Sequence, residues 1–552
     1  MLPDIKKSRS GFSLTSKRRK MAEKFNRATF TRNFLKNITK IKSPDEMIAE
    51  AKAGGLEKTL GVWDLIILGV GVIIGSGIFA IVGIAAAGSV DGSSVGAGPA
   101  LVVSMIIAVI ACIFSALCYS EFAAMIPVSG GAYNYTYATL GEFMAWMVGW
   151  VSILGYGIGF IAVSCAWSNY FVQFMAGFDK VLPQWLAHPP VWLTNEVFSA
   201  GKIVAANPDV FIPKIFGVPI CINLPAIIIV ILMTMVLVKG TKESAKMTGI
   251  MVFVKLAVIA LFVLVGAFYV QPSNWTPFAP HGFEGIIAGA FLIFFAYIGF
   301  DALATSAEEC KNPQRDLPIG IIGSLLITTL VYILVALVLT GMQDTSGAVP
   351  AGFVKAPLVF CMNAVHQNWV AGLISIGSLA GLTSVLLVME MAVTRILYSM
   401  SRDHFVSKRF QKLHPKYHTP ALLTWTVGLI AIIGILTLNL DIATELCNYG
   451  VFTSFIIVCA AVLILRHTDP DRERPFKVPF SPWVPLLGIL TCGGLMVYKS
   501  MQSSSSALLY PVWLGLGAII YLFYGFVRNR DNENKIHKEI VQGFLKEENE
   551  SK

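Results

Sequence analysis

One apolar stretch, residues 60–87, constrains the fold more than any other part of the chain. Its sequence, LGVWDLIILGVGVIIGSGIFAIVGIAAA, is long enough to cross a bilayer, because about 20 apolar residues span roughly 30 Å of hydrocarbon. Near its centre, however, it carries Gly75-Ser76-Gly77, and each glycine inside a helix costs about 1 kcal/mol relative to alanine. The stretch therefore predicts a membrane helix that is interrupted at mid-depth.

Such an interruption leaves the first backbone N–H groups of the second half-helix without intrahelical partners. Inside a membrane, backbone of this kind must be covered by protein or line a cavity. A helix N-terminus also carries partial positive charge, so its natural guest is an anionic group such as a carboxylate. Gly71 and Gly75 form a small-xxx-small pair as well, which by itself indicates only close helix packing. On this stretch alone, both interpretations stay open.

Composition places the rest of the chain in a membrane too. The sequence has 552 residues, of which 55% are hydrophobic and 14% are charged, a balance that no soluble domain of this length needs. Twelve apolar runs are long enough to span: residues 60–87, 99–127, 140–175, 224–238, 247–270, 285–307, 318–342, 369–400, 421–438, 446–465, 483–498 and 510–527. These runs predict an all-α membrane protein with twelve transmembrane helices.

The positions of lysine and arginine predict its orientation. Of the 42 such residues, 36 lie in or beside the segments on the same side as both termini, 5 lie in the opposite loops, and Lys255 lies within a span. Cytoplasmic loops carry an excess of this kind. We therefore expect a multi-pass protein of the cell (inner or plasma) membrane with both termini in the cytoplasm. The net charge of +9 then reflects topology, and no nucleic-acid partner is expected.

Signatures of metals, cofactors and enzymes are missing from the sequence. Its nine cysteines are scattered singly, without a CxxC pair or a zinc-like His/Cys spacing. Cys221 and Cys361 border predicted outer loops, so a disulfide between them is an open alternative. No H-E-x-x-H, G-x-S-x-G or P-loop motif occurs. We expect no cofactor and no enzymatic activity.

A second irregular segment, FFAYIGFD at residues 294–301, lies in the sixth run. An intramembrane carboxylate such as Asp301 is costly enough to suggest a function, although it can also cap a helix or pair with Arg315. Interrupted helices at corresponding positions of two halves are the best sequence sign of a midplane transporter site. The two segments together therefore favour a binding site over simple packing at Gly75-Ser76-Gly77.

Lys255 is the third unusual feature, because apolar residues surround it for a turn or more on each side. Desolvation disfavours its charged form, so this lysine is suited to gain and lose a proton as the conformation changes. The alternative is a permanently charged lysine bonded to backbone carbonyls of the broken first helix. Glu121 and Glu390 are weaker candidates, since both are close enough to the predicted inner ends of their spans to be solvated.

Six segments in order resemble those of the amino acid–polyamine–organocation superfamily, and within it the bacterial cationic amino acid transporter-like branch. They are VKGTKESAK, VKLAVI, GAFYVQPSNW, FFAYIGFDA, EECKNPQRDLPIGIIGSLL and RPFKVPF, and the resemblance extends over residues 45–528. It implies the leucine-transporter fold: two inverted repeats of five helices, two further helices, and transport by alternating access.

The resemblance also assigns roles to residues. Those implied to hold a substrate carboxylate through backbone amides are Ile73, Ser76, Gly77 and Ile78. Those whose carbonyls are implied to hold the α-ammonium are Phe295, Ala296 and Ile298. Leu382 is implied to bound the side-chain pocket, and its bulk favours small neutral substrates over arginine. Lys255 matches the family's lysine that stands in for a sodium ion, which implies proton coupling.

Two departures from the family pattern bear on the substrate. The acidic WDLILEY of many bacterial members is replaced by WVSILGY at residues 150–156, and the QPR after the eighth span is replaced by Val393-Thr394-Arg395. Fewer acids near the centre leave fewer partners for a cationic side chain. We expect a secondary active transporter, a proton-coupled symporter of small neutral or cationic L-amino acids; an exchanger and a non-transporting sensor are the alternatives.

The expected organisation follows from these assignments. Residues 1–44 form a basic cytoplasmic tail expected to be disordered, 45–60 an amphipathic segment, 61–270 the first repeat with an outer loop at 176–223, 285–466 the second repeat, 483–527 the last two helices, and 528–552 a cytoplasmic tail. The expected partners are the amino acid substrate, protons and the lipid bilayer, with a small membrane protein or a second copy of the chain as a further possibility.

Overall fold

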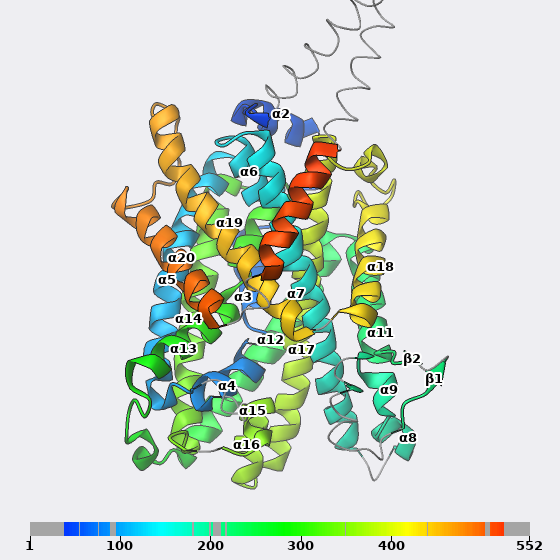
Figure 1. Ribbon diagram of the computed structural model, residues 1–552, viewed down its shortest axis with the longest axis vertical. Coiled ribbons are helices and arrows are strands. Elements are labelled where there is room, and N and C mark those ends of the chain that lie inside the picture. Colours follow the sequence, from blue (N-terminus) through cyan, green and yellow to red (C-terminus); the bar gives the residue numbers. More distant parts are fainter. Residues whose placement is uncertain are drawn as a thin grey trace, which may run out of the picture.

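The computed structural model describes residues 38–53, 56–75, 77–88, 95–178, 182–197, 200–201, 211–215, 218–347, 349–438, 440–502 and 508–523. Most helices run along the long axis of the molecule, and the described chain begins and ends at the same end of the bundle (Figure 1). In these residues the only sheet is a two-stranded antiparallel hairpin, β1 (Lys214–Ile215) with β2 (Val218–Pro219). Most of both predicted tails lies outside the described residues.

Eight helical segments of the described chain are long and apolar enough to cross a membrane. They are built from α5 (Leu101–Met125), α7 (Glu142–Ala176), α12 (Thr241–Gly266), α13 (Gly282–Tyr297) with η5 (Phe300–Glu309), α14 (Pro313–Met342), α17 (Asn368–Arg402), α19 (Leu440–Thr468) and α20 (Trp483–Gln502). Four shorter apolar helices accompany them: α3 (Val62–Ile73), α11 (Leu224–Lys239), α18 (Ala421–Thr437) and Leu508–Phe523. The predicted all-α membrane protein is therefore confirmed.

Large apolar side chains cover the outside of the bundle. Phe253 of α12, Leu330 of α14 and Leu429 of α18 expose 75%, 62% and 59% of their surface. In water such a surface would drive aggregation, but lipid tails are as apolar as leucine. The lipid therefore solvates this face, and the interior is left to close packing and to the polar groups described below.

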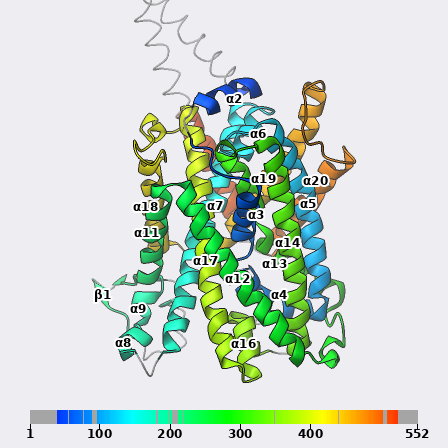
Figure 2. The same cartoon turned by 180° about the vertical axis from the view of Figure 1, so that it is seen from behind.

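Short elements gather at the two ends of the bundle. One end, called the α2 end below, carries α2 (Pro44–Ala53), α6 (Ala132–Tyr137) and η6 (Lys408–Gln411). The opposite end, called the α16 end, carries α8 (Gln184–Ala187), α9 (Val191–Thr194), the hairpin, α15 (Ala351–Lys355) and α16 (Pro357–Ala364), as the two opposite views show (Figures 1 and 2). The 3₁₀ turns η3 (Ala267–Tyr269) and η4 (Pro272–Trp275) connect α12 to α13.

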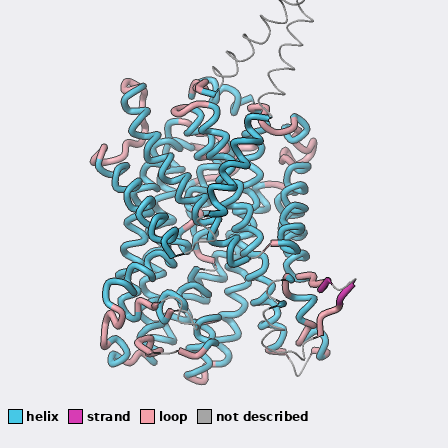
Figure 3. Tube along the Cα trace, in the orientation of Figure 1, coloured by secondary structure: helices cyan, strands magenta, loops and turns pink. Residues whose placement is uncertain are grey.

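The predicted outer loop at residues 176–223 contains the short helices α8 and α9, and also the hairpin, which the sequence did not suggest. Cys221 and Cys361, the possible disulfide partners, are both free and buried, so that alternative is wrong. Loop segments also occur inside the bundle, not only at its ends (Figure 3). These interior segments position the candidate site.

Candidate functional site

The first interruption follows α3. Ile74 leaves the helix with φ −76° and ψ 94°, and the chain becomes helical again in the π-helical turn η1 (Gly77–Ile81), which continues into α4 (Val82–Ala87). Ser76 lies outside the described residues. The N–H groups of Gly77 and Ile78 stand at the start of this second half-helix, where no preceding turn supplies carbonyl partners. The interruption predicted from the sequence is present.

The second interruption follows α13. Ile298 is extended, with φ −61° and ψ 136°, and Gly299 has a φ of +121° before η5 begins at Phe300. This φ is one that residues with a Cβ rarely adopt. A Cβ at Gly299 would also lie 2.6 Å from Cγ2 of Val72 in α3, so both conformation and space require glycine here.

The two interruptions contact each other at the centre of the protein. Gly77 lies so close to Ala296 that a Cβ at position 77 would overlap it. Tyr332 of α14 is fully buried, and its hydroxyl lies 2.8 Å from the carbonyl oxygen of Ile73 and 3.0 Å from that of Ala296. One side chain from a third helix thus joins both broken helices.

The predicted substrate-binding residues that the structure describes lie inside the bundle, and of these Ile73, Gly77 and Ala296 meet at the contact between the interruptions. Ile73, Ile78, Ala296, Ile298 and Leu382 are buried, with exposures of 4% or less, and Phe295 is half-buried. One detail differs from the implied roles. The N–H of Ile74 still donates to the carbonyl of Val70 at 3.1 Å, so the helix extends past Ile73, which offers its carbonyl oxygen rather than its amide to the break.

Lys255 of α12 is completely buried beneath the first interruption. Its Nζ lies 3.1, 2.8 and 2.6 Å from the carbonyl oxygens of Val70, Gly71 and Ile74, and 3.0 Å from Oγ of Ser384. The carbonyls belong to the C-terminal end of α3, where partial negative charge favours a cation. An ammonium carries three N–H donors, so these four acceptors use all of them.

A permanently charged Lys255 bonded to the carbonyls of the broken first helix would make these contacts. A lysine that gains and loses a proton would break them each time it loses its charge. Ser384 of α17 fixes the arrangement, because its hydroxyl is also 2.8 Å from the carbonyl of Gly71. Lys255 thus ties α12 and α17 to the broken end of α3.

Comparison with known proteins decides the family. The family described as amino acid permease matches residues 60–526, which include both interruptions and Lys255. This chain is an amino acid permease by family.

Its relatives support the assignment. The permease is 41% identical to the branched-chain amino acid permease BcaP of Bacillus subtilis (strain 168) over 499 residues, 90% of this chain and 99% of that protein. It is 38% identical to the methylthioribose transporter of the same organism over 492 residues, 89% of this chain and 98% of that protein. It is 34% identical to the chloroplastic cationic amino acid transporter 9 of Arabidopsis thaliana over 509 residues, 90% of this chain and 83% of that protein.

These matches place the permease in the amino acid–polyamine–organocation superfamily, as the sequence motifs predicted. Such proteins are transporters rather than enzymes.

Asp301 of the permease lies just beyond the second interruption, in η5, and is 5% exposed. Its Oδ2 accepts a short hydrogen bond from the hydroxyl of Tyr156 in α7, and its Oδ1 has no partner among the described residues. The alternative that Asp301 pairs with Arg315 is therefore wrong. Arg315 is exposed at the start of α14, while Asp301 faces a phenol inside the bundle.

Glu121 and Glu390 are not solvated, contrary to expectation. Glu121 is 2% exposed, and its oxygens bind the guanidinium of Arg466 and, at 2.7 Å, the N–H of Val478. Glu390 is fully buried and accepts the hydroxyl of Thr234 at 2.6 Å. Tertiary contacts with residues that are distant in the sequence bury both carboxyl groups. The position of a glutamate within its span does not reveal such contacts.

Two ion pairs close the α2 end of the permease between η5 and α17. Buried Glu309 pairs with Arg395, the one residue of the family's QPR pattern that this chain keeps. Glu308 accepts two hydrogen bonds from the guanidinium of Arg402, at 2.6 and 3.1 Å, and one from the N–H of Ser129 at 2.8 Å. Bidentate pairs of this kind fix geometry as well as energy.

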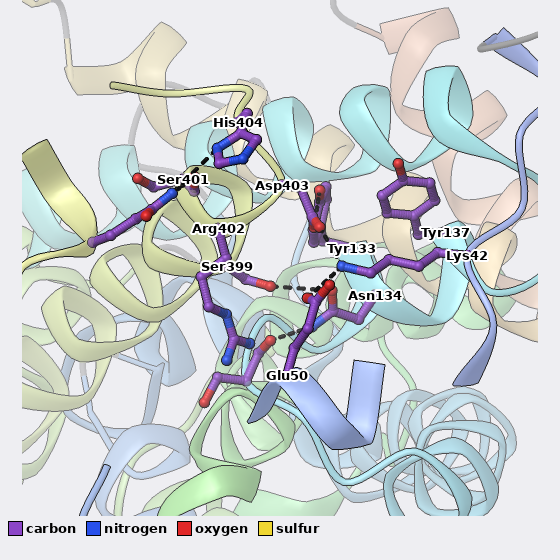
Figure 4. A network of polar contacts seen from close by, with 12 residues as sticks. Lys42, Glu50, Tyr133, Asn134, Tyr137, Ser399, Ser401, Arg402, Asp403 and His404 are labelled. Carbon is purple, nitrogen blue, oxygen red and sulfur yellow. Dashed lines mark hydrogen bonds and ion pairs between the residues drawn. The ribbon is translucent and has the colours of Figure 1, made fainter. Parts of the chain in front are cut away.

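A third contact attaches the segment before α2 to the same helix end (Figure 4). Nζ of Lys42 lies 2.6 Å from Oδ1 of Asp403 and 2.5 Å from Oε2 of Glu50, and the hydroxyl of Tyr133 donates to Asp403 at 2.7 Å. Burial alone lowers the pKa of Lys42, but the attraction and hydrogen bonds of Asp403 and Glu50 outweigh it, so the pKa is raised. The charged form of Lys42 is therefore the stable one.

Proposed function

We propose that this permease is a secondary active transporter that moves small neutral L-amino acids together with protons by alternating access. The observation that carries the proposal is the meeting of two interrupted helices at one point inside the bundle. The N–H groups of Gly77 and Ile78 begin one half-helix there, and the carbonyls at the end of α13 finish another.

The opposite polarity of these ends suits a zwitterion. A helix N-terminus attracts a carboxylate, and a helix C-terminus attracts an ammonium group. In the inferred mechanism, Gly77 and Ala296 move apart to admit the substrate, and displacement of the Tyr332 hydroxyl frees the Ala296 carbonyl for the α-ammonium. Ile78, Ala296 and Tyr332 are buried, and a low-dielectric surrounding strengthens each of these interactions.

The neutral substrate class is supported by the apolar surroundings and by one relative. Leu382, the residue implied to bound the side-chain pocket, is apolar and buried, and the 41% identical relative carries the name of a branched-chain amino acid permease. Cationic amino acids are the runner-up, from the name of the plant relative. Methylthioribose, in the name of another relative, has neither carboxylate nor ammonium to meet the two helix ends.

Proton coupling is proposed at Lys255. Deprotonation of its Nζ would remove the charge that Val70, Gly71 and Ile74 bind, and so would loosen α3 from α12 and α17. An exchanger of one amino acid for another would use the same substrate site without this step. A sensor would bind without net flux.

The proposed topology has twelve spans, arranged as two inverted five-helix repeats with two further helices, and its α2 end faces the cytoplasm of the cell. The eight long and four short apolar helices support the number. The lysines and arginines of the described α2-end segments, against few at the α16 end, support the orientation.

Uptake by proteoliposomes tests the proposal. Purified permease is reconstituted, and radiolabelled leucine, alanine, arginine and methylthioribose are offered with and without an inward proton gradient. We expect gradient-driven accumulation of a neutral amino acid above its external concentration. Counterflow that strictly needs internal amino acid would identify an exchanger, and ligand-induced stabilisation without flux would identify a sensor.

Variants of two lysines on α12 separate coupling from structure. Lys255→Met removes the buried amine, whereas Lys246→Met removes an exposed lysine of the same helix. We expect Lys255→Met to lose gradient-driven accumulation and Lys246→Met to keep it. Substrate-induced thermal stabilisation is measured in parallel, to show that each variant is folded. A folded Lys255→Met protein with unaltered gradient-driven uptake would refute proton coupling at this residue.

A further inference from the structure

A cavity of about 640 Å³ opens at the α2 end, away from the substrate site. Four segments meet around it, and each contributes one cation: Lys52 from α2, Lys58 from the segment before α3, Lys311 after η5, and Arg315 from the first turn of α14. All four side chains are exposed. Within the described residues, none of them takes part in an ion pair.

The cavity keeps its positive charge although Glu308 also lines it. Both carboxylate oxygens of Glu308 are already held by Arg402, as described above. The 30-residue helix α14 begins at the cavity, and its N-cap residue Asn312 makes no side-chain capping bond; Asp316 in the first turn offsets part of the positive potential of this helix start but does not line the cavity. Four cations and an uncapped helix start favour an anion with several oxygens.

A second, apolar cavity of about 680 Å³ adjoins the first, and Gln314 and Arg315 line both. It follows α14 into the membrane past Ile322 and Leu326, and Phe476 of the loop before α20 also lines it. Leu326 is 53% exposed, so this side of α14 faces lipid. Leu326 is eleven residues beyond Arg315, which at about 1.5 Å per residue places it roughly 16 Å deeper.

We propose that the two cavities together bind one anionic phospholipid from the leaflet at the α2 end. The phosphate and headgroup occupy the cationic cavity, and one acyl chain lies in the apolar cavity along α14. A free phosphate ion would use only the first cavity and would leave the second without an occupant. Because the cationic cavity continues into an apolar cavity that faces lipid, the ligand that fits both is an amphiphile.

Binding there would hold the α2 end together. The headgroup would join α2 to the start of α3, the end of η5 and the start of α14. The last three belong to the two broken helices and to the helix of Tyr332. The lipid would therefore stabilise the form in which the α2 end is closed. Lipid binding itself does not depend on the proposed transport function; only its effect on uptake rests on that function.

The test measures binding without using transport. Delipidated permease is titrated with dioleoylphosphatidylglycerol, dioleoylphosphatidylcholine, glycerophosphoglycerol and inorganic phosphate, with thermal unfolding and native mass spectrometry as readouts. We expect retention of one anionic lipid and a rise in unfolding temperature only with phosphatidylglycerol. Equal effects of phosphatidylcholine, or of either soluble phosphate compound, would overturn the proposal.

A charge-matched pair of triple variants locates the site. Lys58→Gln, Lys311→Gln and Arg315→Gln together remove three charges from the cavity. Lys408→Gln, Arg409→Gln and Lys412→Gln together remove three exposed charges from another loop of the α2 end. We expect roughly tenfold or greater weakening in the first variant only, since each basic residue contributes separately to headgroup attraction. Equal weakening in both variants would show diffuse surface charge and refute the site.

The conservative double variant Lys58→Arg and Lys311→Arg keeps the charge and should retain the lipid. It is the control for loss of lipid binding that is caused by misfolding. If binding survives in the proteoliposomes, uptake by wild-type protein should change with the phosphatidylglycerol fraction. Unchanged uptake together with specific binding would overturn only the inferred effect on the α2 end. Binding without any uptake would count against the proposed function and not against the site.

Discussion

The hydroxyl of Tyr332 is shared between two carbonyl groups that lie on different broken helices. A phenol has one proton, so it donates to Ile73 or to Ala296 but fully satisfies neither at once. Both carbonyls are at the ends of helical segments, where intrahelical partners are missing. The bond therefore stabilises the contact between the interruptions and can move from one carbonyl to the other.

Replacement of Tyr332 by phenylalanine tests this role. The variant leaves two buried carbonyls without their donor, and we expect a loss of about 1–3 kcal/mol in the free energy of unfolding, together with slower uptake. Tyr135→Phe is the matched control, because Tyr135 is also fully buried but its hydroxyl has no partner among the described residues. Equal losses in both variants, measured by thermal unfolding and uptake, would contradict the assignment.

The sequence reveals some of these residues and hides others for a physical reason. Lys255 is conspicuous because a charge inside an apolar run is costly wherever the helix lies. Tyr332 is not, because an aromatic residue in a membrane span looks like ordinary packing until the fold places its hydroxyl. The burial of Glu121 is not visible in the sequence either, because its partner Arg466 lies 345 residues further along the chain.

At the scale of elements, the role of a glycine depends on where in the fold it lies. Gly299 has a φ of +121° and packs against Val72, whereas Gly157 in α7 has no atom within 4 Å of the place where a Cβ would be. The same residue type therefore has different roles in the two helices. The sequence predicts both interruptions, because glycine and polar residues weaken a helix locally, but it does not predict that they touch.

Alanine substitution distinguishes the two glycines. Gly299→Ala forces a Cβ into a left-handed conformation and against Val72, so we expect a loss of about 1–3 kcal/mol in the free energy of unfolding, along with lost substrate binding. Gly157→Ala should be neutral or gain up to about 1 kcal/mol, because alanine is the better helix former. Thermal unfolding with and without substrate measures both effects. A neutral Gly299→Ala variant would show that the interruption does not need glycine.

At the scale of the whole molecule, the α2 end is closed by charged contacts and the α16 end lies on the other side of the interruptions. The composition and the positions of lysine and arginine predict a membrane protein and its orientation, and the family motifs predict its architecture. None of these features predicts the charged contacts at the α2 end. Lys42 belongs by sequence to the basic tail, and only the fold brings it to Asp403. Long-range ion pairs of this kind leave no local pattern in the chain.

Release of Lys42 should open the α2 end. We expect Lys42→Gln to speed hydrogen exchange in residues 38–53 several-fold, while Lys40→Gln, which removes an exposed lysine nearby, leaves it unchanged. Because the pKa of Lys42 is raised in the folded protein, its contribution to stability is complete below its unfolded-state pKa and is lost only as the pH rises through the folded value. Exchange in the wild type, corrected for intrinsic rates, should therefore stay slow across neutral pH. Acceleration on mild acidification would contradict this.

One backbone contact limits how the permease can move. Thr59 and Leu60 both donate to the carbonyl of Glu309, at 2.9 and 3.0 Å, and Lys311 donates back to Leu60 at 2.9 Å, in a short parallel bridge. These hydrogen bonds couple the half-helix that begins after Leu60 to the half-helix that ends at Glu309. If one of the two half-helices moves, the other must move with it. The distance between two spin labels, one placed on one of these half-helices and the other on a helix that does not move, would then report the displacement of both half-helices.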